Sequence, residues 1–434
     1  MHDIIPFTKN VHFTQAIKAK ISQFNPSPII IFIEPYGAAL SLIKFGKEKG
    51  YNIIIFTANT DLRIVPISIL NLIGLSVQID TKHEDELFKL MSILKRMIKI
   101  DAVIPGFEYF VPIAIKLSQY LHTPCMSINN AMQLRRKDLM RLQLQQANIA
   151  IPQFHLLNSM KQLDHAMMAI GFPAICKPID AAGSVHVKLV KNKHEAILAV
   201  NNILQSKNIL WGHQLSPMVL LESYINGKEF SVEGVIQQGE VSFFSITEKF
   251  VSDQIEFIEI GHIANAPIEP FLQKKIESYV QAVIKILGAN FCPFHAEIRL
   301  DPHGQPVLME IAARLAGDRI GELINLSRDI QYFDYIYSAY FGEKKLLTPM
   351  RNDHAGIRFF YRPDIEKYTR LSGLEVTENY PVEELTFYYQ ANEHIPAFPK
   401  PLRRLGHVIV NHADYHTVLN ALQKIDDSVV FLTH

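Results

Sequence analysis

Short runs of almost continuous apolar residues, separated by amphipathic stretches, recur through the first quarter of the chain. The runs are PIIIFIE at 28–34, YNIIIFT at 51–57 and AVIP at 102–105. Helical periodicity lies between them, at 38–49 and 85–99. Strands that are apolar on both faces are typical of a parallel sheet whose two faces are covered by helices. The pattern therefore predicts a Rossmann-like parallel α/β domain over residues 1–130.

The turn after the first apolar run, Pro35-Tyr36-Gly37, is where a ligand would approach such a sheet, because ligands bind at the carboxyl ends of parallel strands. The turn has one glycine, and the G-x-G-x-x-G pattern of dinucleotide-binding sheets is absent from it. We therefore do not expect a dinucleotide site there.

The chain has the size and composition of a globular protein with more than one core. Its 434 residues exceed one ordinary domain, 48% of them are hydrophobic, and the formal net charge is zero. A zero net charge gives no electrostatic reason to expect a nucleic acid or an acidic membrane as partner. The cysteines (Cys125, Cys176 and Cys292) lack metal-ligand spacing and fit a reducing compartment. No signal peptide or membrane-spanning run is recognisable, so a cytoplasmic location is expected.

Beyond residue 130, strands and helices no longer alternate regularly. Helices are predicted at 135–148, at 272–287 and from 317 to about 340. Strands are predicted at 172–178, 185–190, 219–224, 229–236, 240–247, 356–361 and 407–411. We expect a central domain over residues 131–342 and a small α+β domain over residues 343–434.

Two glutamates, Glu297 and Glu310, lie in adjacent apolar segments, FCPFHAEIRL and PVLMEIAARL. These segments are predicted to form an antiparallel hairpin that turns at His303-Gly304. The implied pairs are 297 with 310, 298 with 309 and 300 with 307. Facing side chains lie on one face of a sheet, with Cβ atoms roughly 4.5–5.5 Å apart. Two like charges at that separation destabilise the sheet, so a cation is expected between them.

Mg²⁺ fits this position, because it takes oxygen ligands and is commonly held by one or two carboxylates together with substrate phosphates. Arg314, four residues past the second carboxylate, supplies a permanently charged fork for an anion. The three residues together indicate metal-assisted phosphoryl chemistry. Two alternatives stay open: the residues form a surface ion network, or a bulge near Pro302 or Pro306 shifts the pairing by one residue.

A second group of residues has the chemistry of a phosphate site. Lys177 ends a predicted strand, and the small residues Ala182, Gly183 and Ser184 follow it in a loop. Small residues let backbone N–H groups approach phosphate oxygens, and lysine adds a point charge. The loop is not a Walker motif, since G-x-x-x-x-G-K-[ST] is absent.

Three further charged residues are candidates for nucleotide binding: Lys137, in a cation-rich helix, and Glu222 and Glu229, on either side of a turn. Two acids separated by a turn can bind a ribose hydroxyl and an exocyclic amine. Taken singly, each of these residues is more often a solvated charge. Their order along the chain, which runs from the helix cation to the carboxylate hairpin and Arg314, makes them a candidate site.

This order of residues resembles the ATP-grasp superfamily of carboxylate–amine ligases over about residues 130–340, and most of all the bacilysin-synthetase-type L-amino acid ligases. The segments that carry the resemblance are Arg136-Lys137 with Met140-Arg141, Phe172-Pro173 with Lys177-Pro178, Ala182 to His186, Leu221 to Ile225 with Gly227 to Glu229, His295 to Glu297, and Glu310 to Arg314. The likeness implies a multidomain α/β and α+β fold. Its antiparallel catalytic subdomain would carry a lid subdomain at about residues 150–227.

The resemblance also implies a role for each motif. The residues implied to bind ATP are Lys137, Lys177, Ala182, Gly183, Ser184, Glu222, Tyr224, Ile225 and Glu229. Within this set the lysines and the loop contact phosphates, the hinge at 222–225 binds adenine, and Glu229 binds the ribose. Glu297 and Glu310 would hold Mg²⁺, with Mn²⁺ as an alternative, and Arg314 would hold the acyl intermediate.

The sequence departs from the superfamily pattern at two positions. His186 stands in the loop where many members have glycine, which puts the mobility of the loop in doubt. Ala312 stands where many members have the asparagine of E-I-N-x-R, which removes one possible metal ligand. The second change affects the coordination number more than the activity, because Mg²⁺ readily keeps water ligands.

The implied reaction has two steps. A substrate carboxylate attacks the γ-phosphoryl group of ATP, giving an acyl phosphate and ADP, and an amine then displaces phosphate to form an amide. The subgroup makes an amino acid the expected acyl donor and a second amino acid or an amine the expected acceptor. His262 and Asp318 lie where an amino acid is expected to dock, although His262 fits a structural role equally well. His295, two residues before Glu297, is a further candidate.

Two other functions stay open. A biotin-carboxylase-like enzyme would use bicarbonate, and it would need a separate carrier partner because the chain lacks an A-M-K-M motif. A non-catalytic nucleotide-binding module would keep the same acids for structure alone. The ligase would take small-molecule carboxylates and amines as partners, and a homodimer is expected from the resemblance alone.

Overall fold

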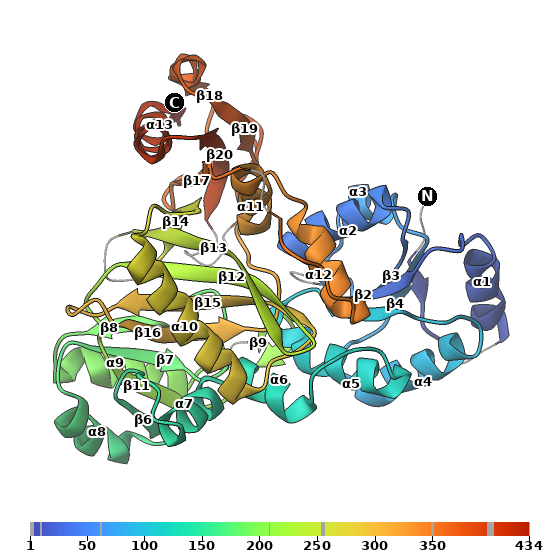
Figure 1. Ribbon diagram of the computed structural model, residues 1–434, viewed down its shortest axis with the longest axis horizontal. Coiled ribbons are helices and arrows are strands. Elements are labelled where there is room, and N and C mark those ends of the chain that lie inside the picture. The colour runs from blue at the N-terminus through green and yellow to red at the C-terminus, as the bar shows by residue number, and fades with distance from the viewer. Residues whose placement is uncertain are drawn as a thin grey trace.

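The computed structural model describes residues 4–8, 11–60, 63–207, 209–252, 257–348, 351–396 and 403–433. These residues form a mixed α/β molecule built around a parallel sheet, a small antiparallel sheet and a large antiparallel sheet (Figure 1). The multidomain α/β and α+β fold class is therefore confirmed. Within these ranges, no helix is long and apolar enough to cross a membrane.

The N-terminal sheet is parallel, as predicted, with strand order β1-β4-β3-β2-β5. Its strands are β1 (Ile5–Pro6), β2 (Ile29–Ile33), β3 (Asn52–Thr57), β4 (Leu75–Gln78) and β5 (Ala102–Pro105). Its helices are α1 (Val11–Ile21), α2 (Ala38–Glu48), α3 (Ile67–Leu70), α4 (Glu84–Lys95) and α5 (Val111–Leu121). The sequence patterns identified β2, β3, β5, α2 and α4.

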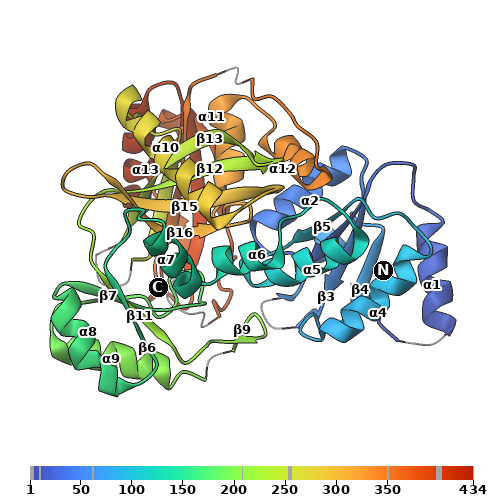
Figure 2. The ribbon, with the colours of Figure 1, turned by 60° about the horizontal axis from the view of Figure 1, so that its bottom comes forward.

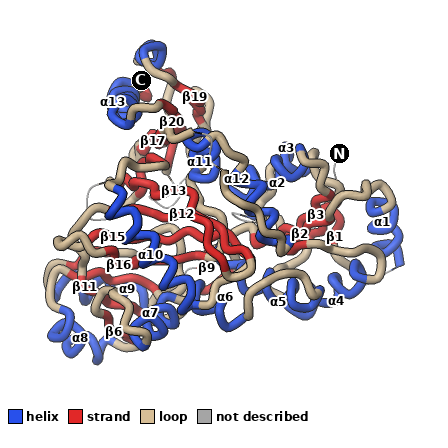
Figure 3. Tube along the Cα trace, viewed as in Figure 1, coloured by secondary structure: helices blue, strands red, loops and turns tan. Residues whose placement is uncertain are grey.

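Alternate residues of β2 enter two different cores. Ile30 and Phe32 pack in a buried cluster that includes residues of α2, whereas Ile31 and Ile33 pack in a second cluster with residues of α4 and α5. Figure 3 shows the strands of this sheet between the two groups of helices. Burial on both faces explains why the strand sequence is continuously apolar rather than alternating.

The strand order places a topological switch point at β2 and β5. The chain runs from β2 to β3 and β4 on one side, and β5 returns to the other side of β2. Ligands bind outside the carboxyl ends of the strands at such a point. Here the two loops that leave the strands touch, because a Cβ on Gly106 would lie 2.3 Å from the carbonyl oxygen of Glu34.

A small lid sheet of order β6-β11-β7-β8 follows in the chain. Its strands are β6 (Phe154–Leu157), β7 (Ala174–Pro178), β8 (Lys188–Val190) and β11 (Val219–Ser223), with helices α8 (Leu163–Ile170) and α9 (Lys193–Leu204). The predicted helix at 135–148 is wrong in its extent: α6 (Ile128–Arg135) and α7 (Lys137–Gln146) are separated by Arg136, whose backbone is extended.

The large antiparallel sheet has the order β16-β15-β12-β13-β14-β17-β20-β19. Its strands are β12 (Glu229–Gln237), β13 (Glu240–Val251), β14 (Glu259–Ala264), β15 (Cys292–Leu300), β16 (Pro306–Ala312), β17 (His354–Tyr361), β19 (Val382–Phe387) and β20 (Arg404–His412). Helix α10 (Pro270–Leu287) lies along one face (Figure 1). The small ribbon β18 (Arg370–Ser372) with β21 (Val430–Leu432) and helix α13 (Tyr415–Ser428) complete the C-terminal part. Strands β17, β19 and β20, from the predicted C-terminal domain, belong to the same sheet as the strands of the predicted central domain. The predicted boundaries at residues 130 and 342 therefore stay predictions.

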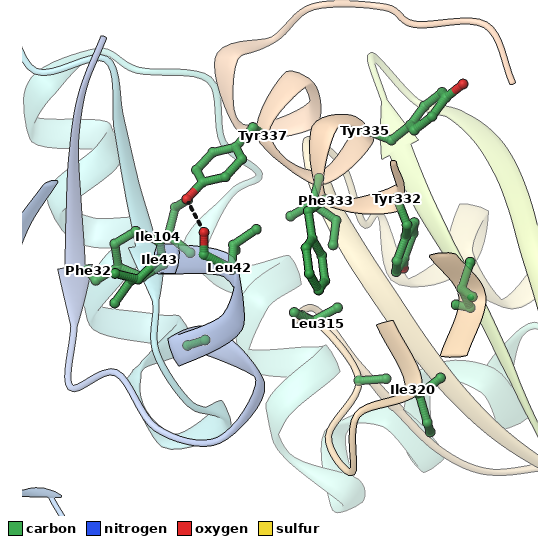
Figure 4. Packing of buried hydrophobic residues seen from close by; sticks show 14 of the residues in the cluster. Phe32, Leu42, Ile43, Ile104, Leu315, Ile320, Tyr332, Phe333, Tyr335 and Tyr337 are labelled. Carbon is green, nitrogen blue, oxygen red and sulfur yellow. Dashed lines mark hydrogen bonds between the residues drawn. The ribbon is translucent and has the colours of Figure 1, made fainter. Parts of the chain in front are cut away.

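Helix α12 joins the N-terminal sheet to the large sheet. The predicted helix from 317 to 340 is instead α11 (Ile320–Arg328) and α12 (Tyr332–Phe341), separated by Asp329 in a left-handed conformation (φ 51°). The Tyr337 hydroxyl donates to the Leu42 carbonyl oxygen at 2.8 Å (Figure 4). Phe32 and Tyr332 belong to one buried cluster that spans both sheets. This continuous core holds the N-terminal sheet against strands β12, β13, β14 and β17 of the large sheet.

Candidate active site

Glu297 on β15 and Glu310 on β16 face each other, as the sequence predicted. The predicted pairs 298 with 309 and 300 with 307 are wrong, since 298 pairs with 308 and 300 with 306. The turn closes one residue earlier, and Met309 is the extra residue of a bulge beside Glu297. The bulge restores the register at the two carboxylates.

Each of the two facing carboxylates has a lysine partner, and the Mg²⁺ expected between them stays a prediction. Lys137, from the start of α7, places its Nζ 2.8 Å from Glu310 Oε1 and 2.7 Å from the Ala181 carbonyl oxygen. Lys249, from β13, places its Nζ 2.6 Å from Glu297 Oε1. Each carboxylate therefore has its own ammonium partner.

Lys249 is also the centre of a larger acidic cluster. Its Nζ lies 3.0 Å from Glu229 and 2.5 Å from Glu259, and its side chain is 1% exposed. Burial lowers the pKa of Lys249, but the carboxylates of Glu259, Glu297 and Glu229 outweigh burial and raise it well above its usual range. Sequence reasoning missed Lys249, because the three acids that surround it come from other strands.

The pKa values of the two facing carboxyl groups are shifted in opposite directions. Burial raises the pKa of Glu297, but Lys249 and His295 outweigh burial and hold it well below its usual range. Burial also raises the pKa of Glu310, and the charges of Glu108 and Glu297 add to this rise against Lys137. The pKa of Glu310 therefore lies above its usual value and that of Glu297 below it.

His295 lies beside this pair and has two carboxylate partners. Its Nδ1 is 2.9 Å from Glu233 Oε1, and its Nε2 is 3.3 Å from Glu297 Oε1. Burial lowers the pKa of His295, but the hydrogen bonds and charges of Glu233 and Glu297 raise it to about 9. His295 is thus protonated at neutral pH and serves to orient Glu297.

This raised pKa predicts how stability depends on pH. A histidine whose pKa rises from 6.5 to about 9 on folding stabilises the fold fully below pH 6.5, and the gain disappears as the pH rises through 9. We expect His295→Gln to lower the free energy of unfolding, relative to the unaltered protein, by up to about 3 kcal/mol more at pH 6.5 than at pH 9.5. Denaturant unfolding in EDTA at both pH values measures this difference, and equal pH slopes for the variant and the unaltered protein would contradict it.

Lys177 and Glu222 form a buried ion-pair group with Arg141. Lys177 Nζ lies 2.6 Å from Glu222 Oε2, and Arg141 Nε lies 2.5 Å from Glu222 Oε1. Burial raises the pKa of Glu222, but Arg141 and Lys177 outweigh burial and lower it. Because Arg141 also donates to the Met309 carbonyl oxygen at 2.8 Å, this group ties the lid strands to the carboxylate hairpin.

The candidate phosphate loop has a left-handed backbone in its middle. Gly183 (φ 68°) and Ser184 (φ 56°) both have positive φ, and nothing lies within 4 Å of a Cβ placed on Gly183. The Ala182 N–H donates to the Tyr109 hydroxyl at 3.3 Å. At the start of the loop, the Lys137 N–H donates to the Ile179 carbonyl oxygen at 2.9 Å. The loop is thus anchored at its base and open at its glycine.

The hinge residues after β11 meet β15 through Arg299. Arg299 donates to Glu229 Oε2 at 2.9 Å and 2.8 Å and to the Ile225 carbonyl oxygen at 3.1 Å. Its guanidinium lies 5.2 Å from the Tyr224 ring centroid. The predicted ribose acid therefore lies between Arg299 and Lys249.

Arg314 is held by Glu108, which follows β5 of the N-terminal sheet. Its Nη2 and Nε donate to Glu108 Oε2 at 3.0 Å and 3.3 Å, and its guanidinium lies over the Phe107 ring at 5.6 Å. Both partners follow β5 at the switch point. Burial raises the pKa of Glu108, but Arg314, Arg135 and Lys137 outweigh burial and lower it. Sequence reasoning missed Glu108, because it lies 206 positions from Arg314.

The remaining substrate candidates form a separate group. His262 Nε2 lies 3.2 Å from Asp318 Oδ2 and 3.5 Å from Glu259 Oε2. Arg404, from β20, donates to both carboxylate oxygens of Asp318 at 2.6 Å and 2.8 Å. Asp318 is therefore held in place by Arg404 of β20. Glu259 also pairs with Lys249, so this group adjoins the acidic cluster around Lys249.

Part of the chain matches a known protein family. Residues 170–322 match the family model of the ATP-grasp domain. The chain is 26% identical over 251 residues to the alanine–anticapsin ligase of Bacillus subtilis (strain 168), which covers 54% of this chain and 53% of that protein. It is 25% identical over 346 residues to the dapdiamide A synthase of Enterobacter agglomerans, which covers 77% and 78%. The chain thus spans about half the length of the first of these relatives.

The fold has a counterpart among solved structures. The crystal structure of an L-amino acid ligase from Bacillus licheniformis superposes with a TM-score of 0.79 at 19% identity. The superposition covers 94% of this chain and 100% of that chain. At this identity the likeness concerns the fold.

Proposed function

We propose that this chain, whose residues 170–322 match the family model of the ATP-grasp domain, is an ATP-dependent ligase that joins a carboxylate to an amine through an acyl phosphate. One observation supports this most. Glu297 and Glu310 face each other, each with a lysine partner, and the same hairpin leads to Arg314. A facing acid pair beside an anion-binding arginine suits phosphoryl transfer to a carboxylate.

The residues present fit a divalent cation. Glu297 and Glu310 face each other across the hairpin and offer carboxylate oxygens as ligands. Ala312 faces His295 and adds no ligand, so water would complete the coordination. Mg²⁺ in this place, or Mn²⁺ as an alternative, would neutralise charge on the transferred phosphoryl group.

The proposed ATP site lies between the lid sheet and the large sheet. Lys137 and Lys177 would contact phosphates, and the N–H groups of Ala182–Ser184 would cover them. The hinge at 222–225 would take adenine and Glu229 the ribose. Lysines already paired with carboxylates are pre-oriented, so phosphate oxygens would exchange places with partners such as Glu310.

Arg314 would stabilise the tetrahedral oxygen anion of the second step, exchanging Glu108 for the reacting group. We propose amino acids as substrates, because the carboxylates of Glu259 and Asp318, which lie together beside His262, complement an ammonium group. The names of the two curated relatives are consistent with amide formation. The cytoplasmic location and the homodimer stay predictions.

Amino acids supplied singly and in pairs, with ATP and Mg²⁺, provide the test. We expect ADP and phosphate to appear only with a productive pair, together with an amide product of matching mass. Bicarbonate with biotin is the comparison for carboxylase activity, and ADP release with that pair alone would favour the carboxylase. Nucleotide binding without substrate-dependent ADP release for any pair would favour the non-catalytic module.

A further inference from the structure

A hairpin of the lid reaches across to the N-terminal sheet. Strands β9 (Ile209–Leu210) and β10 (His213–Gln214) pair with each other between α9 and β11. Figure 2 shows β9 projecting from the lid toward the N-terminal strands. Trp211, the single tryptophan of the chain, lies at the tip and is 8% exposed. Because a tryptophan at a hairpin tip is buried only when it packs against other residues, the tip must have a docking surface, which we call the seat.

The seat consists of rings that follow β2 and β5. The Trp211 ring centroid lies 4.2 Å from that of Tyr36 and 4.6 Å from that of Phe107, and the His213 ring stacks on Tyr109 at 5.4 Å. Such aromatic pairs add attraction beyond that of the buried area alone. The tip therefore docks at the switch point, where a ligand crevice is expected.

The tip conformation needs the glycine beside the tryptophan. Trp211 (φ 53°) and Gly212 (φ 79°) both adopt left-handed backbone conformations. A Cβ on Gly212 would lie 2.9 Å from Arg63 Nη1 of the N-terminal part. The close approach and the positive φ together show that the hairpin is built to fit this surface.

The same seat contacts both halves of the candidate active site. Phe107 lies under the Arg314 guanidinium and precedes Glu108, the partner of Arg314. Tyr109, under His213, accepts the Ala182 N–H of the phosphate loop. Undocking the hairpin would therefore expose the residues that surround the transferred phosphoryl group.

We propose that Trp211 is a positioning residue that latches the lid onto the N-terminal sheet and keeps water from the acyl phosphate, an inference that rests on the proposed ligase function. Without the latch, water would attack the acyl phosphate and give the free carboxylic acid and inorganic phosphate. One ATP would then be consumed without an amide. The latch thus determines the coupling between ATP use and amide formation.

The ratio of ADP to amide measures this coupling. We expect Trp211→Ala to raise the ratio at least about fivefold, with Trp211→Phe restoring most of the coupling because it keeps a ring in the seat. Leu198→Ala, at an exposed position of the lid helix α9, is the matched control and should leave the ratio unchanged. An unchanged ratio in a folded Trp211→Ala protein that still forms amide would overturn the latch.

Fluorescence tests the latch independently of ligase activity. Acrylamide quenching of Trp211 in the unaltered protein, with a non-hydrolysable ATP analogue, should be weak, and Tyr36→Ala should raise the quenching constant at least about twofold by opening the seat. Quenching typical of an exposed tryptophan in the unaltered protein would overturn the proposal. If no substrate pair releases ADP, the ligase function fails, whereas ligation with an exposed Trp211 refutes the latch alone.

Discussion

Replacement of Glu310 by alanine is expected to lower substrate-dependent ADP release by at least roughly 10³-fold, because loss of a metal carboxylate removes several kcal/mol of charge stabilisation. Glu310 faces Glu297 across the hairpin, and of the two it is the one whose pKa lies above its usual value. It also pairs with Lys137 at 2.8 Å. The change therefore disturbs both the proposed metal site and a proposed phosphate ligand. Coupled-enzyme detection of ADP measures the effect.

Two further variants separate chemistry from folding. Glu310→Gln keeps the volume of the side chain and should lose nearly as much activity, with thermal unfolding close to that of the unaltered protein. Glu240→Ala removes a 68% exposed glutamate from β13 of the same sheet and should retain full activity. Undiminished ADP release by Glu310→Gln would remove the metal assignment.

Replacement of Arg314 by alanine should lower amide formation on the order of 10²–10³-fold, the usual effect of losing one donor to a tetrahedral oxygen anion. Nucleotide binding should persist, because the contacts of Arg314 are with Glu108, Phe107 and its own neighbour Leu315, not with the hinge. Amide yield by mass spectrometry and nucleotide affinity by calorimetry measure the two effects separately.

A conservative change and a control sharpen this second prediction. Arg314→Lys keeps the charge but loses the planar fork, so it should recover only part of the activity. Arg351→Ala, at a 57% exposed arginine outside the site, should behave like the unaltered protein. Equal loss of nucleotide affinity and amide yield in Arg314→Ala would assign the residue to nucleotide binding instead of to the oxygen anion.

The parallel sheet was predictable where burial on both faces made its strands continuously apolar. β2, β3 and β5 fulfil that condition and were identified. The residues of β4, LSVQ, include two polar ones, and β1 has two residues, so neither has a recognisable pattern. The strand β14 (EIGHIA) was missed for a related reason, since its Glu259 and His262 face the acidic cluster rather than an apolar core.

The facing of Glu297 and Glu310 was predictable, although the turn register was wrong. A period of two and the position of the turn limit the pairing to a few choices. The bulge at Met309 then corrected the one-residue difference at the turn. The pairing at the carboxylates was therefore right, whereas the pairs nearer the turn were not.

The sequence by itself determined which segments could be buried strands, which acids face each other within one hairpin, and which motifs suit phosphate. Those properties depend on local periodicity and on short sequence separations. Only the tertiary structure decided that Lys249 lies among three carboxylates, that Glu108 holds Arg314, and that Trp211 is seated on the far sheet. The physical reason is that these partners come from different strands or from different parts of the molecule. Packing in three dimensions, which no local pattern encodes, sets the distance between them.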